Sequence, residues 1–163
     1  MPEKVTIFIG ADYRGFQKKS ELIPYLKSCH QNFIKVVDKG AFDDSLSDYN
    51  DPAIAVAKAI KSTPNSFGIL LCGSAHGVCM QANRFKGIRA INAFSPESAQ
   101  IGREHDNANV LCLSADRLNL AKDPLETEKA YEDLFAIIEK FFNTPFSGEA
   151  RHLRRIKRLD KEI

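Results

Sequence analysis

The sequence predicts an α/β fold in which helices cover both faces of a parallel β-sheet, giving three layers. Short apolar segments alternate with helical segments along the whole chain, which is the pattern of βαβ units. No repeat, low-complexity stretch or linker interrupts this alternation. Residues 1–163 are therefore predicted to form a single domain, and this length suffices for a buried core.

The first half of the chain is predicted to hold three strands and two helices. The strands are residues 5–10 (VTIFIG), 33–40 (FIKVVDKG) and 66–72 (SFGILLC), which are short apolar runs. Residues 15–30 follow a helical pattern in which Pro24 favours a kink. After a polar loop, Asp51 and Pro52 are the predicted N-cap and first residue of a helix over residues 52–62.

The second half continues the alternation. A helix is predicted over residues 77–85, a strand over 87–94 (GIRAINAF), a helix over 96–105 that begins at Ser95-Pro96-Glu97, and a strand over 108–115 (ANVLCLSA). Residues 124–143 form a long amphipathic helix and residues 151–163 a short basic one. The apolar stripe of the long helix is predicted to be core or interface; it comprises Phe135, Ile137, Ile138, Phe141 and Phe142.

Composition excludes several classes of protein. With 44% hydrophobic and 27% charged residues the chain has an ordinary globular composition, and it shows neither a secretory signal nor a membrane-spanning run. Four cysteines without C-x-x-C spacing argue against a disulfide framework and a structural zinc site. A net charge of +2, and a basic tail without interleaved aromatic residues, argue against a nucleic-acid partner. We expect a reduced, cytoplasmic protein without a metal site.

Two loops are expected to meet at one edge of the sheet. In such folds small ligands bind beyond the carboxyl ends of the strands, where the strand order reverses. In the common order 2-1-3-4-5 this point lies between strands 1 and 3, so residues 10–15 (GADYRG) would face residues 72–77 (CGSAHG). The second loop enters a helix, whose N-terminal N–H groups suit an anion and would lower the pKa of the Cys72 thiol. The loop is neither a P-loop nor a dinucleotide fingerprint.

Six motifs recur in the order of a known family. GADYRGF, SDYNDPA, GILLCGSAHG, ANRFKGIRA, REHDNANVLCLSADRL and FSGEARHLRRI resemble the ribose-5-phosphate isomerase B family, which includes the galactose-6-phosphate isomerase subunits. The resemblance covers nearly the whole chain. It implies a Rossmann/flavodoxin-like fold and interconversion of D-ribose 5-phosphate and D-ribulose 5-phosphate through a cis-enediol, without metal or other cofactor. It also implies a dimeric unit, and we expect a homodimer or tetramer with a basic tail of about residues 146–163 packing on the dimer.

The resemblance assigns roles residue by residue. Cys72 matches the base that moves a proton between C2 and C1, and His105 matches the residue that opens the sugar ring. Val78 stands where one branch of the family has a Glu base, so Cys72 is the only base candidate that either pattern offers. The residues in substrate-binding positions are Asp12, Tyr13, the enediolate loop Gly73, Ser74, Ala75, His76 and Gly77, Asp106, and the phosphate clamp Arg151 and Arg155.

Four positions depart from the family pattern. Tyr13 replaces a His, Ala75 a Gly that suits φ > 0, Asp106 an Asn, and Asp116 a third phosphate-binding Arg, with Arg117 one residue later. These departures keep two alternatives open. The protein could isomerise a 6-phosphohexose such as allose or galactose 6-phosphate, or it could be a non-catalytic sugar-phosphate-binding paralogue.

Each candidate residue also has a simpler interpretation. Cys29, Cys79 and Cys112 are expected to be packing residues, His105 could only cap a helix, and the basic tail could be a solvated helix face. Topology adds a constraint, because Cys72 ends the third strand whereas His105 precedes the fifth. A strand spans roughly 17–20 Å, so a His105 that acts on a sugar at Cys72 would come from a second subunit. Otherwise His105 is a cap and the site lies within one chain.

Overall fold

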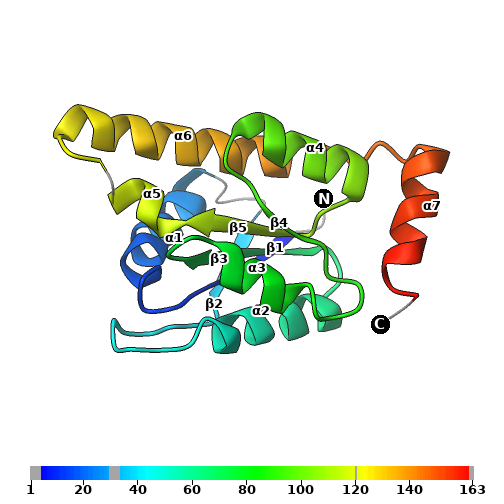
Figure 1. The fold of residues 1–163 in the computed structure, drawn as a ribbon, viewed down its shortest axis with the longest axis horizontal. Coiled ribbons are helices and arrows are strands. Elements are labelled where there is room, and N and C mark those ends of the chain that lie inside the picture. The colour runs from blue at the N-terminus through cyan, green and yellow to red at the C-terminus, as the bar shows by residue number, and fades with distance from the viewer. Residues whose placement is uncertain (1–4, 30–33, 120, 162–163) are drawn as a thin grey trace.

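The computed structural model describes residues 5–29, 34–119 and 121–161, and it confirms the α/β class (Figure 1). Five parallel strands form one sheet. The strands are β1 (Val5–Ala11), β2 (Ile34–Asp38), β3 (Ser66–Cys72), β4 (Ala90–Asn92) and β5 (Val110–Ser114). The helices are α1 (Phe16–Cys29), α2 (Asn50–Ser62), α3 (His76–Ala82), α4 (Pro96–Asp106), α5 (Ala115–Asn119), α6 (Pro124–Asn143) and α7 (Ala150–Leu159).

Helices cover both faces of the sheet, as predicted. Alternate side chains of β3 point to opposite faces, so Ile69 and Leu71 enter one core and Leu70 and Cys72 the other. The first core also takes buried residues of α1, α4, α5 and α6, and the second those of α2 and α3. Figure 1 shows α4 and α6 on one side of the sheet and α2 and α3 on the other. Cys72 therefore lies on the side covered by α2 and α3.

The strand order is β2-β1-β3-β5-β4, so the expected order 2-1-3-4-5 is wrong at one edge. β4 has three residues, two of them only half-buried, and among the described strands it pairs with β5 alone. The first four residues of β5 are fully buried, and that strand pairs with both β3 and β4. A longer, more apolar strand suits the interior of a parallel sheet, and a short strand suits its edge. The reversal between β1 and β3 is unaffected.

Helix starts were predicted with mixed success. Ser95 caps α4 as expected: its Oγ accepts a hydrogen bond from the backbone N–H of Ser98 in a capping box. Asp51, by contrast, is not the N-cap of α2, which begins at Asn50 and follows Tyr49 without a side-chain cap. The short helix α5, directly after β5, was not predicted.

The apolar stripe of α6 lies in the first core, where Ile137, Ile138 and Phe141 are buried and Phe135 and Phe142 pack against them. Cys112 is buried and Cys79 half-buried, as expected of packing residues, while the Cys29 side chain lies outside the described residues. Within residues 5–29, 34–119 and 121–161, no helix is long and apolar enough to span a bilayer.

Candidate active site

Asp12 and Cys72 lie side by side at the carboxyl ends of β1 and β3. Ala11 pairs with Leu71, and the backbone N–H of Asp12 donates to the Leu71 carbonyl at 3.2 Å. Both side chains are almost buried, with 6% of Asp12 and 5% of Cys72 exposed. Gly15 permits this close approach, because a Cβ there would lie 2.6 Å from the Leu71 carbonyl oxygen. The two loops thus meet where the sequence placed them.

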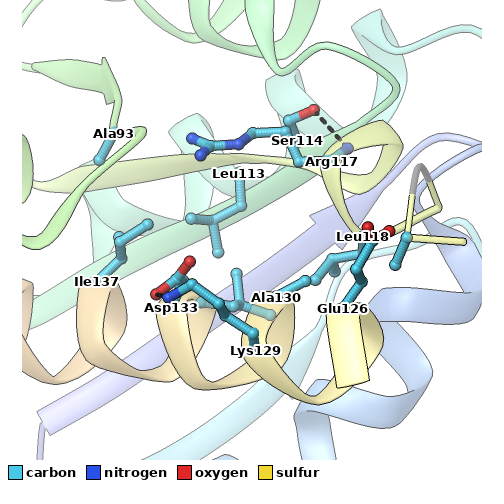
Figure 2. Close-up of a pocket in the computed structure, with 12 residues that line it drawn as sticks. Ala93, Leu113, Ser114, Arg117, Leu118, Glu126, Lys129, Ala130, Asp133 and Ile137 are labelled. Atoms are coloured by element: carbon cyan, nitrogen blue, oxygen red, sulfur yellow. Dashed lines mark hydrogen bonds and ion pairs between the residues drawn. The ribbon is translucent and has the colours of Figure 1, made fainter. Parts of the chain in front are cut away.

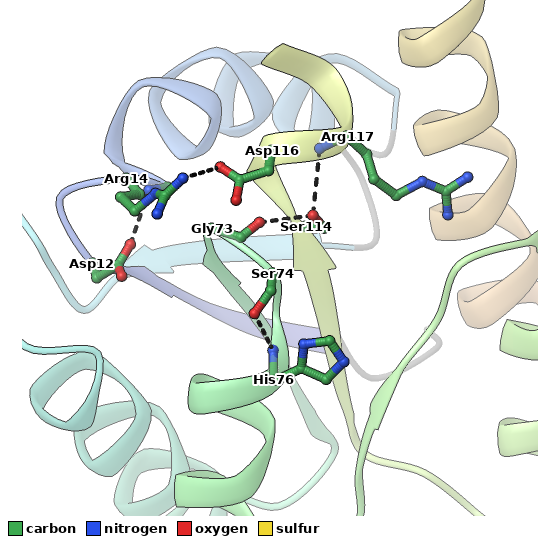
Figure 3. A network of polar contacts seen from close by, with 9 residues as sticks. Asp12, Arg14, Gly73, Ser74, His76, Ser114, Asp116 and Arg117 are labelled. Atoms are coloured by element: carbon green, nitrogen blue, oxygen red, sulfur yellow. Dashed lines mark hydrogen bonds and ion pairs between the residues drawn. The ribbon is translucent and has the colours of Figure 1, made fainter. Parts of the chain in front are cut away.

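The loop over residues 73–77 has a defined conformation. Ala75 adopts a left-handed backbone with φ of 69°, the conformation that favours glycine. The Ser74 hydroxyl accepts a hydrogen bond from the backbone N–H of His76 at 3.3 Å, and both side chains are exposed (Figure 3). The Tyr49 ring packs against Gly77, where a Cβ would lie 2.8 Å from ring atoms. The loop therefore presents a hydroxyl to solvent above a buried thiol.

The pKa of the Cys72 thiol is raised, contrary to the expectation of a thiolate favoured by the helix start. Burial is the largest cause, followed by the backbone N–H of Val78, which lowers the pKa. The nearby Asp12 carboxylate raises it further, and the N–H groups of Ala75 and Gly77 lower it. The predicted N–H groups are present, but the desolvation of the thiolate outweighs them.

The environment of Asp12 disfavours the charged form of its carboxyl group. Its pKa is raised by burial, and the backbone N–H groups of Gly15 and Arg14 oppose this shift. The Gly15 N–H donates to Asp12 Oδ1 at 3.0 Å. The guanidinium of Arg14 also lowers the pKa, and Asp116 raises it. Asp12 and Cys72 are thus two buried acidic groups close enough for the Asp12 charge to act on the thiol.

An ion pair crosses the sheet edge above them. Arg14 Nη2 donates to Asp116 Oδ1 at 2.8 Å, joining the loop after β1 to α5 (Figure 3). A Cβ at Gly73 would lie 2.9 Å from Arg14 Nε and 3.0 Å from Asp116 Oδ2, so the pair rests on Gly73. Sequence reasoning assigned Arg14 no role. The available signal was a cation two residues after Asp12, in a loop already expected to face the substrate.

Arg117 is placed differently. Its Nη1 donates to the Phe94 carbonyl at 2.6 Å, and Figure 3 shows its guanidinium directed away from Gly73. The Gly73 carbonyl instead accepts hydrogen bonds from the backbone N–H of Asp116 at 3.0 Å and from Ser114 Oγ at 2.7 Å. The cation beside the loop is therefore Arg14.

The remaining candidate residues lie at the end of the molecule opposite the carboxyl ends of the strands. His105 is in the last turn of α4, and its ring centroid is 4.4 Å from that of His152 on α7. Figure 1 shows this end of α4 and all of α7 far from α5 and the carboxyl ends of the strands. Asp106, Arg151 and Arg155 are exposed there. Within one chain, Asp12, Cys72 and the loop come together, but His105, Asp106 and the two arginines do not join them.

The simpler interpretation of the basic tail as a solvated helix face does not hold for His152. It is 3% exposed, and its Nδ1 lies 2.7 Å from Ser147 Oγ. The backbone N–H of Ser147 in turn donates to the Glu104 carbonyl at 2.9 Å. His152 thus fastens α7 to the end of α4 beside His105. The sequence gives little sign of this, since His152 sits among charged residues.

A cavity of about 310 Å³ lies elsewhere, between β5, α5 and α6 (Figure 2). Leu113, Leu118, Leu134 and Ile137 supply apolar lining, with charged side chains from α5 and α6 around them. It contains neither Asp12 nor Cys72, so the chemistry is not placed there. Among the residues that the structure describes, no group of three or more His, Cys, Asp or Glu side chains is arranged to hold a metal ion.

Comparison with known proteins agrees with the geometry. A family model described as Ribose/Galactose Isomerase matches residues 7–159. The chain belongs to this family. Members similar to it include the probable ribose-5-phosphate isomerase B of Mycoplasma pneumoniae, 36% identical over 94% of this chain and 91% of that protein. The ribose-5-phosphate isomerase B of Escherichia coli K12 is 32% identical over 94% of this chain and 93% of that protein.

Solved structures of the family share the whole fold. A ribose 5-phosphate isomerase from Thermotoga maritima superposes with a TM-score of 0.82 at 37% identity, covering 96% of this chain and 97% of that one. The Mycoplasma genitalium ribose-5-phosphate isomerase B, solved with bound ribulose-5-phosphate, gives 0.79 at 36% identity, covering 95% and 93%. The sequence-based family resemblance is therefore confirmed.

Proposed function

We propose that this isomerase-family protein interconverts D-ribose 5-phosphate and D-ribulose 5-phosphate, with Cys72 as the base. The observation that carries the proposal is the buried Cys72 thiol, which lies beside Asp12 and beneath the loop of residues 73–77. Family members of similar length named ribose-5-phosphate isomerase B support the choice of substrate. Val78 stands where one branch of the family has its Glu base, and its apolar side chain cannot accept a proton.

The reaction needs one proton moved between neighbouring carbons. The Cys72 thiolate removes the proton from C2 of the open-chain aldose, and the electrons of that C–H bond form the C1–C2 double bond while the C1 carbonyl oxygen becomes the enediolate oxygen. The hydroxyl proton on the C2 oxygen then passes to the C1 oxygen, and the Cys72 thiol returns its proton to C1, which leaves the carbonyl at C2 of the ketose and regenerates the thiolate. Such a base contributes roughly 10²–10⁴-fold to rate. The N–H groups of Val78, Ala75 and Gly77 stabilise the thiolate, since each lowers the pKa of Cys72.

The enediolate oxygen needs donors that are already in place before the reaction. We assign this role to the exposed Ser74 hydroxyl and the backbone N–H groups of the loop over residues 73–77. A preorganised donor of this kind is typically worth about 2.7–4 kcal/mol of transition-state stabilisation. Asp12 is assigned to a substrate hydroxyl, because its carboxyl lies next to Cys72. Tyr13, the next residue, is exposed, and its hydroxyl can donate a hydrogen bond to the substrate.

Ring opening is assigned to His105 of a second copy of this chain. An imidazole ring can both donate and accept a proton through its two nitrogens. His105 and the exposed Arg151 and Arg155 lie together at the end of the fold opposite Cys72, which a two-fold dimer can bring to the partner's loop. The two arginines lie one helical turn apart on α7, a spacing that suits a phosphate clamp. The homodimer and its shared sites are part of this proposal.

A coupled isomerase assay tests the proposal. Ribose 5-phosphate, allose 6-phosphate and galactose 6-phosphate are compared for wild type, Cys72→Ala and the control Cys79→Ala, whose half-buried thiol lies on α3. Turnover of ribose 5-phosphate should be lost in Cys72→Ala, with substrate still bound, and kept in Cys79→Ala. Near-normal kcat in Cys72→Ala contradicts the role of the thiol. If only a hexose phosphate is turned over, that sugar and not ribose 5-phosphate is the substrate. Binding without any turnover would indicate a non-catalytic paralogue.

A further inference from the structure

The Arg14 guanidinium lies next to the loop that follows Cys72. It lies against Gly73, the residue that follows Cys72: a Cβ added at Gly73 would lie 2.9 Å from Arg14 Nε. Asp116 Oδ1 accepts from its Nη2 at 2.8 Å. Because β1, β3 and β5 are neighbours in the sheet, this contact joins residues that are 102 positions apart in the chain. The Arg14 guanidinium thus lies beside Gly73, between Cys72 and Ser74 in the chain.

The local charge balance makes a cation necessary for an anionic ligand. Asp12 and Asp116 are two carboxyl groups close enough to influence each other, since Asp116 raises the pKa of Asp12 and Arg14 lowers it. Without Arg14 the sheet edge would present two acids to a sugar phosphate and repel it. Arg117 does not supply the charge there, because its guanidinium bonds to the Phe94 carbonyl and points away.

The guanidinium retains donors for a ligand. It has five N–H groups, and the contact with Asp116 Oδ1 engages Nη2. The Arg14 side chain is 53% exposed, so the remaining donors on one side reach solvent. A planar fork that is already held in place by a carboxylate is well suited to bind phosphate oxygens in pairs.

We propose that Arg14 binds the phosphate group of the substrate and that Asp116 is its positioning residue. The inference rests on the proposed sugar-phosphate substrate and adds to it a residue that the sequence-based assignment lacks. Arg14 reaches the phosphate from the chain that also carries Cys72, whereas Arg151 and Arg155 approach from the partner. The phosphate is thus held by both subunits.

The test measures phosphate binding apart from catalysis. Arg14→Gln keeps a long side chain with an N–H donor for Asp116 but removes the charge. We expect the Kd of inorganic phosphate, measured by calorimetry, and the KM for ribose 5-phosphate to rise roughly tenfold to a hundredfold, the worth of one hydrogen bond to a charged group. We expect kcat to change much less. The matched control is Arg84→Gln, an exposed arginine beyond the far end of α3, which should leave both constants unchanged.

Two further variants make the outcome decisive. Arg117→Gln should leave the phosphate Kd within about twofold of wild type, and Asp116→Asn should weaken phosphate binding less than Arg14→Gln does. An unchanged phosphate Kd in Arg14→Gln, or an equal loss in Arg117→Gln, overturns the inference, as does wild type that binds no phosphate. A loss of thermal stability without a change in Kd would show a merely structural ion pair. Calorimetry needs no turnover, so wild type that binds phosphate through Arg14 but isomerises no sugar would contradict only the proposed function.

Discussion

At the scale of single residues, the opposing effects on Cys72 decide how the site behaves. Burial raises the pKa of the thiol, Val78 N–H lowers it, and the Asp12 carboxylate raises it again. Before substrate arrives the thiol is therefore the dominant form near neutral pH, and the thiolate is the minority form that reacts. Reactivity should rise with pH as the thiol loses its proton.

Replacing Asp12 tests this balance, because Asp12→Asn removes the negative charge and should lower the pKa of Cys72. The pH at which Cys72 becomes reactive toward iodoacetamide should then shift downward, since less alkali is needed to form the thiolate. The alkylation rate is followed against pH, and Cys72→Ala provides the background from the other cysteines. A profile that stays in place would show that Asp12 does not act on the thiol. An upward shift would mean that Asp12 stabilises the thiolate instead.

At the scale of elements, the start of α1 determines where Asp12 and Arg14 lie. Gly15 packs directly on the backbone of β3, and one turn later the buried Lys19 ammonium binds the Asp38 carboxylate at 2.6 and 2.8 Å and also donates to the Ala41 carbonyl. These contacts attach α1 to β3 and β2 at once. The loop between β1 and α1 is consequently held on both sides, close to Cys72.

Gly15→Ala should disturb this arrangement. The added Cβ would lie 2.6 Å from the Leu71 carbonyl oxygen, which is backbone and cannot rotate away. Relief requires α1 to move from β3, so we expect a loss of about 1–3 kcal/mol in unfolding free energy, typical of overpacking. Activity should fall as well, because Asp12 and Arg14 move with the loop. Urea denaturation and kcat/KM measure the two effects.

The control for this change is Ser20→Ala, an exposed position on the same helix whose hydroxyl donates to the Phe16 carbonyl. It should alter the unfolding free energy by less than about 0.5 kcal/mol. If Gly15→Ala were as stable and active as Ser20→Ala, the contact between α1 and β3 would not position the site.

At the scale of the whole molecule, the proposed catalytic groups lie at two ends. Cys72 and Arg14 lie at or just beyond the carboxyl ends of β3 and β1, whereas the His105 ring of α4 lies close to the His152 ring of α7, tilted by 31°. Figure 1 shows α7 standing beside the sheet at the end opposite α5. Each end of a single chain therefore carries only part of the proposed catalytic groups. A two-fold dimer can bring one end of each chain to the opposite end of its partner.

Mixing two inactive variants tests the shared site. Cys72→Ala lacks the base and His105→Asn lacks the ring-opening group, so each homodimer should be impaired. A heterodimer of the two has one site with both defects and one with neither. After subunit exchange at equal concentrations, activity should recover to roughly a quarter of wild type, because half of the dimers are mixed and each has one intact site.

Exchange must be verified independently, for example by energy transfer between labelled subunits. If exchange is complete and no activity returns, the site does not combine Cys72 of one chain with His105 of the other. Mixing Cys72→Ala with wild type provides the control, since it creates no new complete site beyond those of wild-type chains.

The sequence by itself determined the alternation of strands and helices and the meeting of Asp12 with Cys72. Both depend on local patterns, because apolar runs specify strands and the parallel topology places the ends of neighbouring strands together. The motif resemblance likewise identified the family. Ser95 was recognised as a cap for the same reason: capping involves residues a few positions apart.

Only the tertiary structure decided the features that depend on residues distant in the chain. The place of β5 beside β3, the raised pKa of Cys72, the contact of His105 with His152 and the Arg14–Asp116 pair all belong to this group. Strand order depends on which strand would lose more buried apolar surface at the edge of the sheet. The pKa of a group depends on the total desolvation and charge around it. Arg14 and Asp116 become partners because the sheet brings together two loops that are 102 residues apart, a distance over which no local pattern operates.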